Sequence, residues 1–336
     1  MTLPPRLGFC ALGLLLLPPP PAAISTTPNR QHPAIAFASK ATGNWEIHLV
    51  NPDDRRSVRL TFRPGEDRFP VWSPDGAHIA FGSQVAEDWE LWVMDTSGGH
   101  QRRLAPQIIA KSPRVWSPDG RRIAFAAGRR GRGDIAVVRF DGTGLTTLTG
   151  DDTDDLDPSW SPDGRRIAFT SVRGGNADIW VVDVENHNQV RLTAASAADN
   201  NPAWSPDGQR IAFTSTRGGN RDIYIMHTDG SGIMRLTTDP AAEGQPAWSP
   251  DGKWIAMQVI RGENYDIDVI DASSGARRRL AASPAYDGAV AWSPDGTRLA
   301  FISSRDGFDA LYVTTLSGTA LTRLSSTPSL NPGWSP

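Results

Sequence analysis

The pentapeptide Trp-Ser-Pro-Asp-Gly constrains this chain of 336 residues more than any other feature, because it recurs at a fixed interval. Its six copies start 44 residues apart, and a truncated Trp-Ser-Pro copy closes the chain. The copies start at Trp72, Trp116, Trp160, Trp204, Trp248, Trp292 and Trp334. Units of about 40–45 residues with four strands each are typical of β-propeller blades. The interval therefore predicts an all-β ring.

Each unit contains the pattern of four short strands. Pro-Asp-Gly after the Trp-Ser strand is typical of a tight hairpin turn, because proline presets φ and glycine accepts a positive φ. The second strand carries a large residue, an alanine and a large residue, as in residues 79–81. Strand alternation puts the large pair on one face and alanine on the other, which suits blades that pack against neighbours on both sides.

The count of strands predicts how the ring closes. Three strands of the unit occur seven times from about residue 34, whereas the Trp strand occurs first at Trp72 and last at Trp334. We therefore predict a seven-bladed β-propeller of four-stranded blades, closed by the N-terminal three strands plus the C-terminal one strand. This closure removes the open sheet edges that favour aggregation. Residues 33–336 are expected to form this single domain.

The first 23 residues differ from the rest of the chain. Arg6 is their only charge, residues 7–17 are an apolar run, and prolines precede Ala22-Ala23. This layout predicts a signal peptide with cleavage within residues 23–33. An apolar run of about 11 residues is too short to span a bilayer, so we expect no stable membrane insertion after cleavage. We expect a periplasmic or secreted protein of the bacterial envelope.

The extended repeat resembles the PD40, or WD40-like, repeat of the TolB family. The shared pattern is Pro-x-Trp-Ser-Pro-Asp-Gly-x-x-Ile-Ala-Phe, then Arg-Gly-Gly-Asn-x-Asp-Ile-Tyr, then Arg-Leu-Thr, and residues 201–237 follow it almost throughout. The resemblance covers residues 33–336. It implies a propeller in an exported protein that works by protein contact. The TolB propeller has six blades and an additional α/β domain, so the seven units of this chain depart from that pattern.

Composition and motifs argue against several classes of function. A net charge of −3 does not suit a general nucleic-acid binder. The six histidines fall at unrelated positions of the repeat, and no Gly-x-Ser-x-Gly motif is present. Cys10 is the only cysteine, which excludes an internal disulfide. We therefore expect a non-catalytic protein without a cofactor, while a carboxylate- or metal-dependent activity is the alternative.

The position five residues before each repeat tryptophan is the main candidate site. It is acidic in five units, and Asp157 belongs to an acidic connector beside it. We expect these residues to share the mouth of the channel: Asp67, Asp155, Asp157, Asp199, Glu243 and Asp287. Two interpretations stay open, which are solvated carboxylates and an electronegative funnel for a cation or a basic segment. Calcium is the candidate metal, at Asp155, Asp199 and Glu243.

Two further sets of residues recur in the repeat. The arginines after the second strand include Arg173 and Arg217, and we expect each to pair with the aspartate five residues later, Asp178 or Asp222. Trp45 and Trp89 stand at one position in neighbouring units, and either pack in the core or form an aromatic patch for a partner or a sugar.

These patterns lead to one expected function and one alternative. We expect a monomeric binding scaffold that contacts a protein or peptide, in particular a basic segment, through its channel-mouth face. The alternative is a carbohydrate-active propeller, either a glycan-binding module or a polysaccharide lyase. Exposed aromatic residues on one face would favour the sugar, whereas an acidic funnel would favour the basic peptide.

Overall fold

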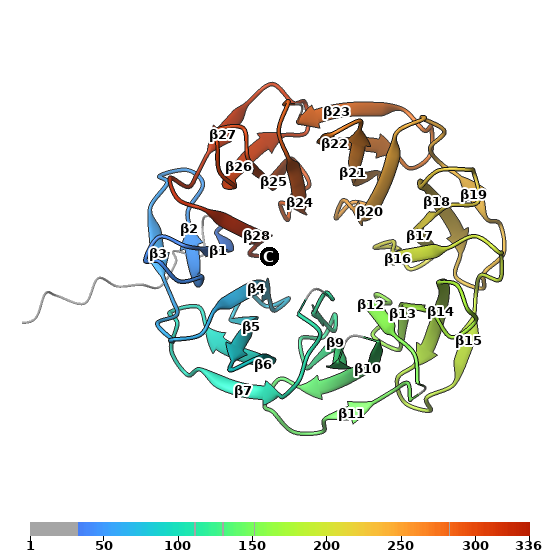
Figure 1. Cartoon of the computed structure of the whole chain (residues 1–336), viewed down its shortest axis with the longest axis horizontal. Coiled ribbons are helices and arrows are strands. Elements are labelled where there is room, and N and C mark those ends of the chain that lie inside the picture. Colours follow the sequence, from blue (N-terminus) through green and yellow to red (C-terminus); the bar gives the residue numbers. More distant parts are fainter. Residues whose placement is uncertain (1–32, 111, 130, 151, 282) are drawn as a thin grey trace, which may run out of the picture.

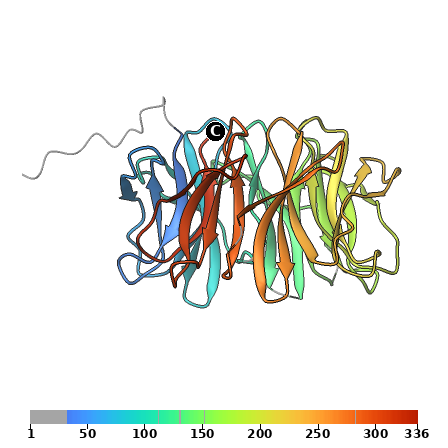
Figure 2. The same ribbon diagram turned by 90° about the horizontal axis from the view of Figure 1, so that it is seen from above.

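The computed structural model describes residues 33–110, 112–129, 131–150, 152–281 and 283–336. In these residues seven four-stranded antiparallel sheets stand as blades around a central channel, as Figure 1 shows. From the side, the strands run between the two end faces of a flat ring (Figure 2). The seven-bladed propeller predicted from the repeat is confirmed. The predicted signal peptide lies outside the described residues, and none of those described forms a helix that could cross a membrane.

The strands are numbered along the chain, and the four strands of each blade follow one another from the channel outward. Blade I contains β28 (Ser329–Trp334), β1 (Ile35–Ser39), β2 (Glu46–Val50) and β3 (Ser57–Arg59). Blade II contains β4 (Asp67–Trp72), β5 (His78–Val85), β6 (Asp88–Asp95) and β7 (Arg102–Ala105). Blade III contains β8 (Val115–Trp116), β9 (Arg122–Arg129), β10 (Arg132–Arg139) and β11 (Thr146–Thr147). Blade IV contains β12 (Asp155–Trp160), β13 (Arg166–Ser171), β14 (Asp178–Asp183) and β15 (Gln189–Arg191).

The other three blades follow the same plan. Blade V contains β16 (Asp199–Trp204), β17 (Arg210–Ser215), β18 (Asp222–His227) and β19 (Met234–Arg235). Blade VI contains β20 (Ala242–Trp248), β21 (Trp254–Arg261), β22 (Asn264–Asp271) and β23 (Arg277–Ala281). Blade VII contains β24 (Asp287–Trp292), β25 (Arg298–Ser303), β26 (Ala310–Thr315) and β27 (Leu321–Arg323).

The ring closes as the strand count predicts. β28 is the innermost strand of blade I and pairs antiparallel with β1, with Trp334 opposite Ile35 and Ser329 opposite Ser39. Beyond the ladder, the amide of Ala34 donates to Ser335 Oγ over 2.9 Å. The two ends of the propeller therefore complete one sheet, which protects the strand edges at the seam.

The blades pack by the alternation read from the sequence. Ile79 and Phe81 of blade II are buried in a cluster with Ala36 and Ala38 of blade I. Ala80, on the other face of the same strand, lies in a cluster with large residues of blade III such as Phe125. Large side chains of one blade thus fill the space that small side chains leave on the next blade.

The repeated pentapeptide forms a braced turn that also joins adjacent blades. In the first copy, the amide of His78 donates to Ser73 Oγ over 2.9 Å, and the amide of Ala77 donates to Asp75 Oδ1 over 2.9 Å. Gly76 has a φ of 67°, which other residues rarely adopt. The proline of one turn lies against the glycine of the next, because a Cβ on Gly120 would meet Pro74 at 3.7 Å. The motif is therefore both a local turn and an inter-blade contact.

Candidate functional site

The rim carboxylates are the five acidic residues in the position five before the repeat tryptophan. They lie at one end of the channel, which we call the rim face, because the innermost strands begin there. They are Asp67, Asp155, Asp199, Glu243 and Asp287. Their side chains are buried, with exposed fractions of 0–1%. The sequence predicts their shared position, but not this burial.

Arginines from the loop after the second strand neutralise three of the rim carboxylates. Arg217 Nη2 lies 2.7 Å from Asp199 Oδ2, and its Nε donates to Ser215 Oγ over 2.9 Å. The same arrangement recurs at Arg173 with Asp155 and at Arg305 with Asp287. A buried carboxylate requires such pairing, because an isolated charge is strongly disfavoured away from water. The pairs stabilise the start of each innermost strand.

The predicted partners of these arginines are wrong in blades IV and V. Asp178 pairs instead with Arg191 of the fourth strand at 2.6 Å, and Asp222 pairs with Arg235 at 2.8 Å. Of blades IV, V and VI, only blade VI shows the predicted pair, since Arg261 contacts Asp266 at 2.9 Å. Blades IV and V thus each hold two separate acid–arginine pairs where the sequence suggested one.

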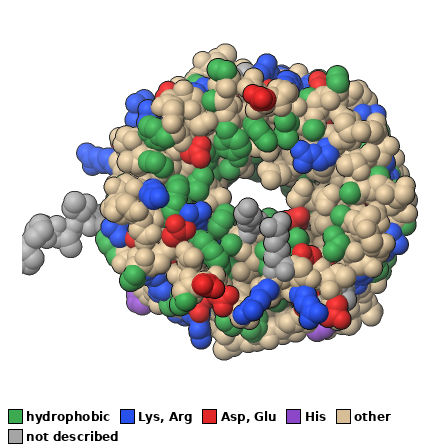
Figure 3. All heavy atoms as spheres, in the orientation of Figure 1, with side chains coloured by type: hydrophobic (Ala, Val, Ile, Leu, Met, Phe, Trp, Pro, Cys, Tyr) green, Lys and Arg blue, Asp and Glu red, His purple; other side chains and the backbone are tan. Residues whose placement is uncertain are grey.

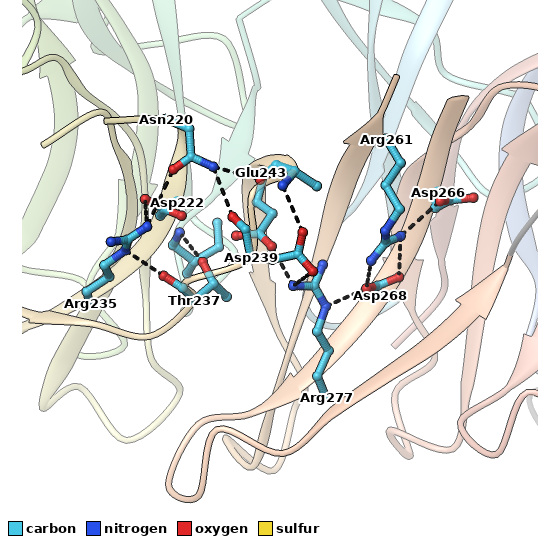
Figure 4. A network of polar contacts seen from close by, with 12 residues as sticks. Asn220, Asp222, Arg235, Thr237, Asp239, Glu243, Arg261, Asp266, Asp268 and Arg277 are labelled. Carbon is cyan, nitrogen blue, oxygen red and sulfur yellow. Dashed lines mark hydrogen bonds and ion pairs between the residues drawn. The ribbon is translucent and has the colours of Figure 1, made fainter. Parts of the chain in front are cut away.

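Blade VI combines these pairs in a larger network, shown in Figure 4. Arg261 contacts Asp268 as well as Asp266, and no ion pair joins it to the rim carboxylate of its own blade among the described residues. Arg277 of the fourth strand pairs with the rim carboxylate Glu243 instead, and it also contacts Asp268. Four of the five rim carboxylates, all but Asp67, therefore have a guanidinium partner in the described part of the chain.

The burial of the rim carboxylates and their pairing with arginines argue against the expected electronegative funnel. All five rim carboxylates are buried, and four of them pair with an arginine. Among the described residues no group of three or more His, Cys, Asp or Glu could hold a metal ion. Pairing with arginines therefore weakens the electrostatic attraction that these carboxylates would exert on a basic segment.

Trp45 and Trp89 are half-buried and belong to different core clusters. Trp45 packs against the cluster between blades I and II, with the Arg68 guanidinium 4.8 Å from the centre of its ring. Trp89 packs against the cluster between blades II and III, where its ring lies 5.9 Å from that of Phe69. Packing is the role that these contacts support.

The residue two positions after each rim position has a strained backbone conformation in most blades. In six innermost strands this residue has a positive φ between 53° and 59°, and none of the six is glycine. The six are Phe69, Asp157, Asn201, Gln245, Ala289 and Asn331. The strand carries a bulge at this point, as between Leu156 and Ser159 of β12. Backbone strain of this kind is commonly found where a side chain must point in a particular direction.

Three of these strained residues meet in a cavity of about 290 Å³ on the channel side of blades IV to VI. The lining residues are Asp157, Asn200, Asn201, Thr214, Arg221, Gly244, Gln245, Gln258 and Ile260. Asn201 Nδ2 donates to Asp157 Oδ2 over 3.0 Å, and burial raises the pKa of the Asp157 carboxyl. The cavity is thus a polar pocket, rich in amide side chains, in the wall of the channel that Figure 3 shows as an opening.

The sequence predicts only Asp157 among these lining residues. Asn201 and Gln245 stand two positions after the acidic column that the sequence singles out. Their signal is the chemistry of that neighbouring column, which is apolar at Phe69 and Ala289 but polar in the three consecutive blades IV, V and VI, and again at Asn331 of blade I. The bulge that turns these side chains toward the cavity is visible only in the structure.

A seven-bladed propeller closed by its C-terminal strand, with braced Trp-Ser-Pro-Asp-Gly turns, defines the class of this protein. Family comparison gives the narrower assignment. The model of the TolB beta propeller domain, PD40, matches residues 26–155, 107–188, 156–243 and 238–336. The chain belongs to this family, and the resemblance seen in the sequence is confirmed.

Solved structures show the same fold at low sequence identity. TolB from Acinetobacter baumannii aligns with a TM-score of 0.62 at 22% identity, over 90% of this chain and 66% of that chain. An oligogalacturonate lyase in complex with manganese aligns with a TM-score of 0.67 at 14% identity, over 86% and 84%. A puromycin-hydrolyzing peptidase from Mycobacterium tuberculosis aligns with a TM-score of 0.64 at 16% identity, over 88% and 54%. Comparison with curated proteins gave no match.

Proposed function

We propose that this chain is a non-catalytic scaffold of the bacterial envelope that binds a protein or peptide through its rim face. Membership of the TolB propeller family is the observation that carries the proposal, and the relatives with that name support it. The rim face suits such a role because acid–arginine pairs fix the strand ends from which its loops project. Preorganised loops lose less conformational entropy when a partner binds.

The alternative of an enzyme has weaker support in this chain. Among the described residues the histidines and carboxylates form no metal cluster, and arginines neutralise rim carboxylates such as Asp199. The peptidase relative contains almost as much chain again outside the matched region. Its activity is therefore a poor guide to a propeller that matches only about half of it.

The proposed location in the periplasm or outside the cell rests on the predicted signal peptide and on the TolB relatives. With one cysteine the chain forms no internal disulfide, so an exported form must hold its fold by packing and ion pairs alone.

Charge reversal on the two end faces tests the rim face as the docking surface. Arg129 and Glu263 are exposed in loops of the rim face, whereas Arg165 is exposed in a turn of the opposite face. Partners are captured from the envelope fraction with the wild-type protein, with R129E/E263R and with R165E. We expect the rim variant to lose a partner that R165E retains. Equal capture by all three proteins would contradict docking on the rim face.

A further inference from the structure

The hydroxyl of Thr214 is buried in the lining of the amide-rich cavity and has no hydrogen-bond partner among the described residues. The residue is 2% exposed, and its Oγ1 makes no hydrogen bond to that part of the chain. Blade IV shows how the repeat satisfies this group. There Thr170 Oγ1 donates to Asp157 Oδ2 and accepts from the amide of Asn201. A buried hydroxyl left alone is unfavourable, so a ligand at Thr214 would restore what the neighbouring blade already has.

Gly244 leaves the space beside this hydroxyl open. A Cβ at Gly244 would lie 3.7 Å from Thr214 Oγ1, an ordinary contact distance. The same repeat position holds Leu156 in blade IV and Leu330 in blade I. Blade VI therefore omits a side chain that the fold accepts elsewhere, and the cavity occupies the room.

Three further polar side chains of the cavity have no hydrogen-bond partner among the described residues, and the charges of the cavity nearly cancel. The side chains of Asn200, Gln245 and Arg221 make no hydrogen bond to another described residue. Within the described residues, both hydrogen bonds to the Asp157 side chain end on Oδ2. One carboxylate and one guanidinium accompany four amide side chains. Amides present a donor and an acceptor close together, which is the complement of a hydroxyl group.

Two tyrosines lie next to this cavity toward blade VII. A Cβ built on Gly288 would meet both Tyr286 Oη and Nε2 of the lining residue Gln258, so Tyr286 reaches the edge of the cavity. The rings of Tyr265 and Tyr286 are 5.5 Å apart, and Tyr286 is 37% exposed. An exposed aromatic face beside polar groups suits a ligand with both C–H and hydroxyl surfaces.

We propose that this cavity binds an uncharged sugar, one or two units of a glycan. Its volume of about 290 Å³ lies near the lower end of ligand pockets, which suits one or two rings. Thr214, Asn201 and Gln245 bond to ligand hydroxyls, Asp157 Oδ1 accepts one more, and the tyrosines contact the sugar ring. The site does not depend on a protein partner at the rim face.

Saturation-transfer NMR and thermal shift with neutral disaccharides test the site. The probes are maltose, cellobiose, lactose and diacetylchitobiose, with digalacturonate as the acidic comparison. The proteins are the wild type, G244L, T214V and the control N331A. G244L places the leucine side chain of blade IV, Leu156, in the cavity. N331A is the control because Asn331 has the same positive φ as the lining residue Asn201 but lies outside the cavity.

We expect at least one neutral disaccharide to bind with a dissociation constant of roughly 1 mM or below. G244L abolishes this binding, T214V weakens it roughly 10-fold, and N331A leaves it unchanged. T214V keeps or raises the melting temperature, because it replaces an unsatisfied hydroxyl by a methyl group, so weaker binding is not explained by unfolding. Binding of no neutral probe, binding of digalacturonate alone, or binding that survives in G244L would each overturn the proposal. Capture of a protein partner by G244L stays as in the wild type, which separates this test from that of the scaffold.

Discussion

Asp67 is the rim carboxylate for which the repeat supplies no arginine. The loop after β5 reads Gln84-Val85-Ala86-Glu87, where blades IV, V and VII place their rim-pairing arginine. Both carboxylate oxygens of Asp67 are buried beside the hydroxyl groups of Ser83 and Thr61, and no arginine pairs with them in the described part of the chain. Burial raises the pKa of Asp67 from 3.8 to about 6. The folded protein therefore holds a proton on Asp67 in a pH range where the unfolded chain has lost it.

The sign and size of the effect follow from this pKa shift. Below about pH 4 both states are protonated, and Asp67 has no electrostatic penalty. As the pH rises from about 4 to about 6, the unfolded chain loses this proton while the folded state keeps it, so the free energy of unfolding falls; above 6 the folded state buries the charge and the loss is complete. The difference between a pKa of 3.8 and one of about 6 corresponds to about 3 kcal/mol. D67N keeps the shape of the protonated acid, so above pH 6 it should be more stable than the wild type by up to about 3 kcal/mol, or roughly 5–10 °C in melting temperature.

Unfolding of both proteins by urea at pH 4, 5.5 and 7.5 measures this dependence. The stability gain of D67N should be near zero at pH 4 and largest at pH 7.5. D199N is the matched control, because Asp199 is equally buried but pairs with Arg217. It should be less stable than the wild type at pH 7.5 by about 1–3 kcal/mol, since it leaves the guanidinium without its carboxylate. A gain for D67N that is equal at all three pH values would refute the assignment to Asp67 ionisation.

Three further predictions concern the ring, its bulges and the N-terminus. Deletion of residues 329–336 removes all of β28, including the buried Trp334. It should lower the free energy of unfolding by more than the loss of one buried tryptophan, which costs about 3–5 kcal/mol. A loss of only a degree or two in melting temperature would mean that the ring closes in another way. A289G removes the strain of a φ of 53° and should stabilise the protein by about 0.5–1 kcal/mol, whereas A291G on the same strand should destabilise it, as thermal melts will show. N-terminal sequencing of the exported protein should give a first residue within 23–33, and recovery of intact Met1 in the soluble envelope fraction would contradict the signal peptide.

The local features and the number of blades were determined by the sequence alone. Pro-Asp-Gly predicts its turn because the conformational preferences of proline and glycine are properties of the residues themselves. The alternation in Ile79-Ala80-Phe81 predicts the packing because strand geometry has a fixed period. The offset of the Trp strand predicts the closure, since it leaves three strands at one end and one at the other.

The partners of charged groups and the exposure of the site were decided by the tertiary structure. Arg217 lies five residues before Asp222 and eighteen after Asp199, and the sequence favours the nearer acid. The fold brings the first strand beside the second, so Arg217 pairs with Asp199, which is the more distant acid in the sequence. Asp222 pairs with Arg235 on the other side. The cavity at Thr214 arises in the same way. It depends on Gly244 of the next blade and on bulges that turn Asn201 and Gln245 toward it, and both are relations between strands that no single repeat contains.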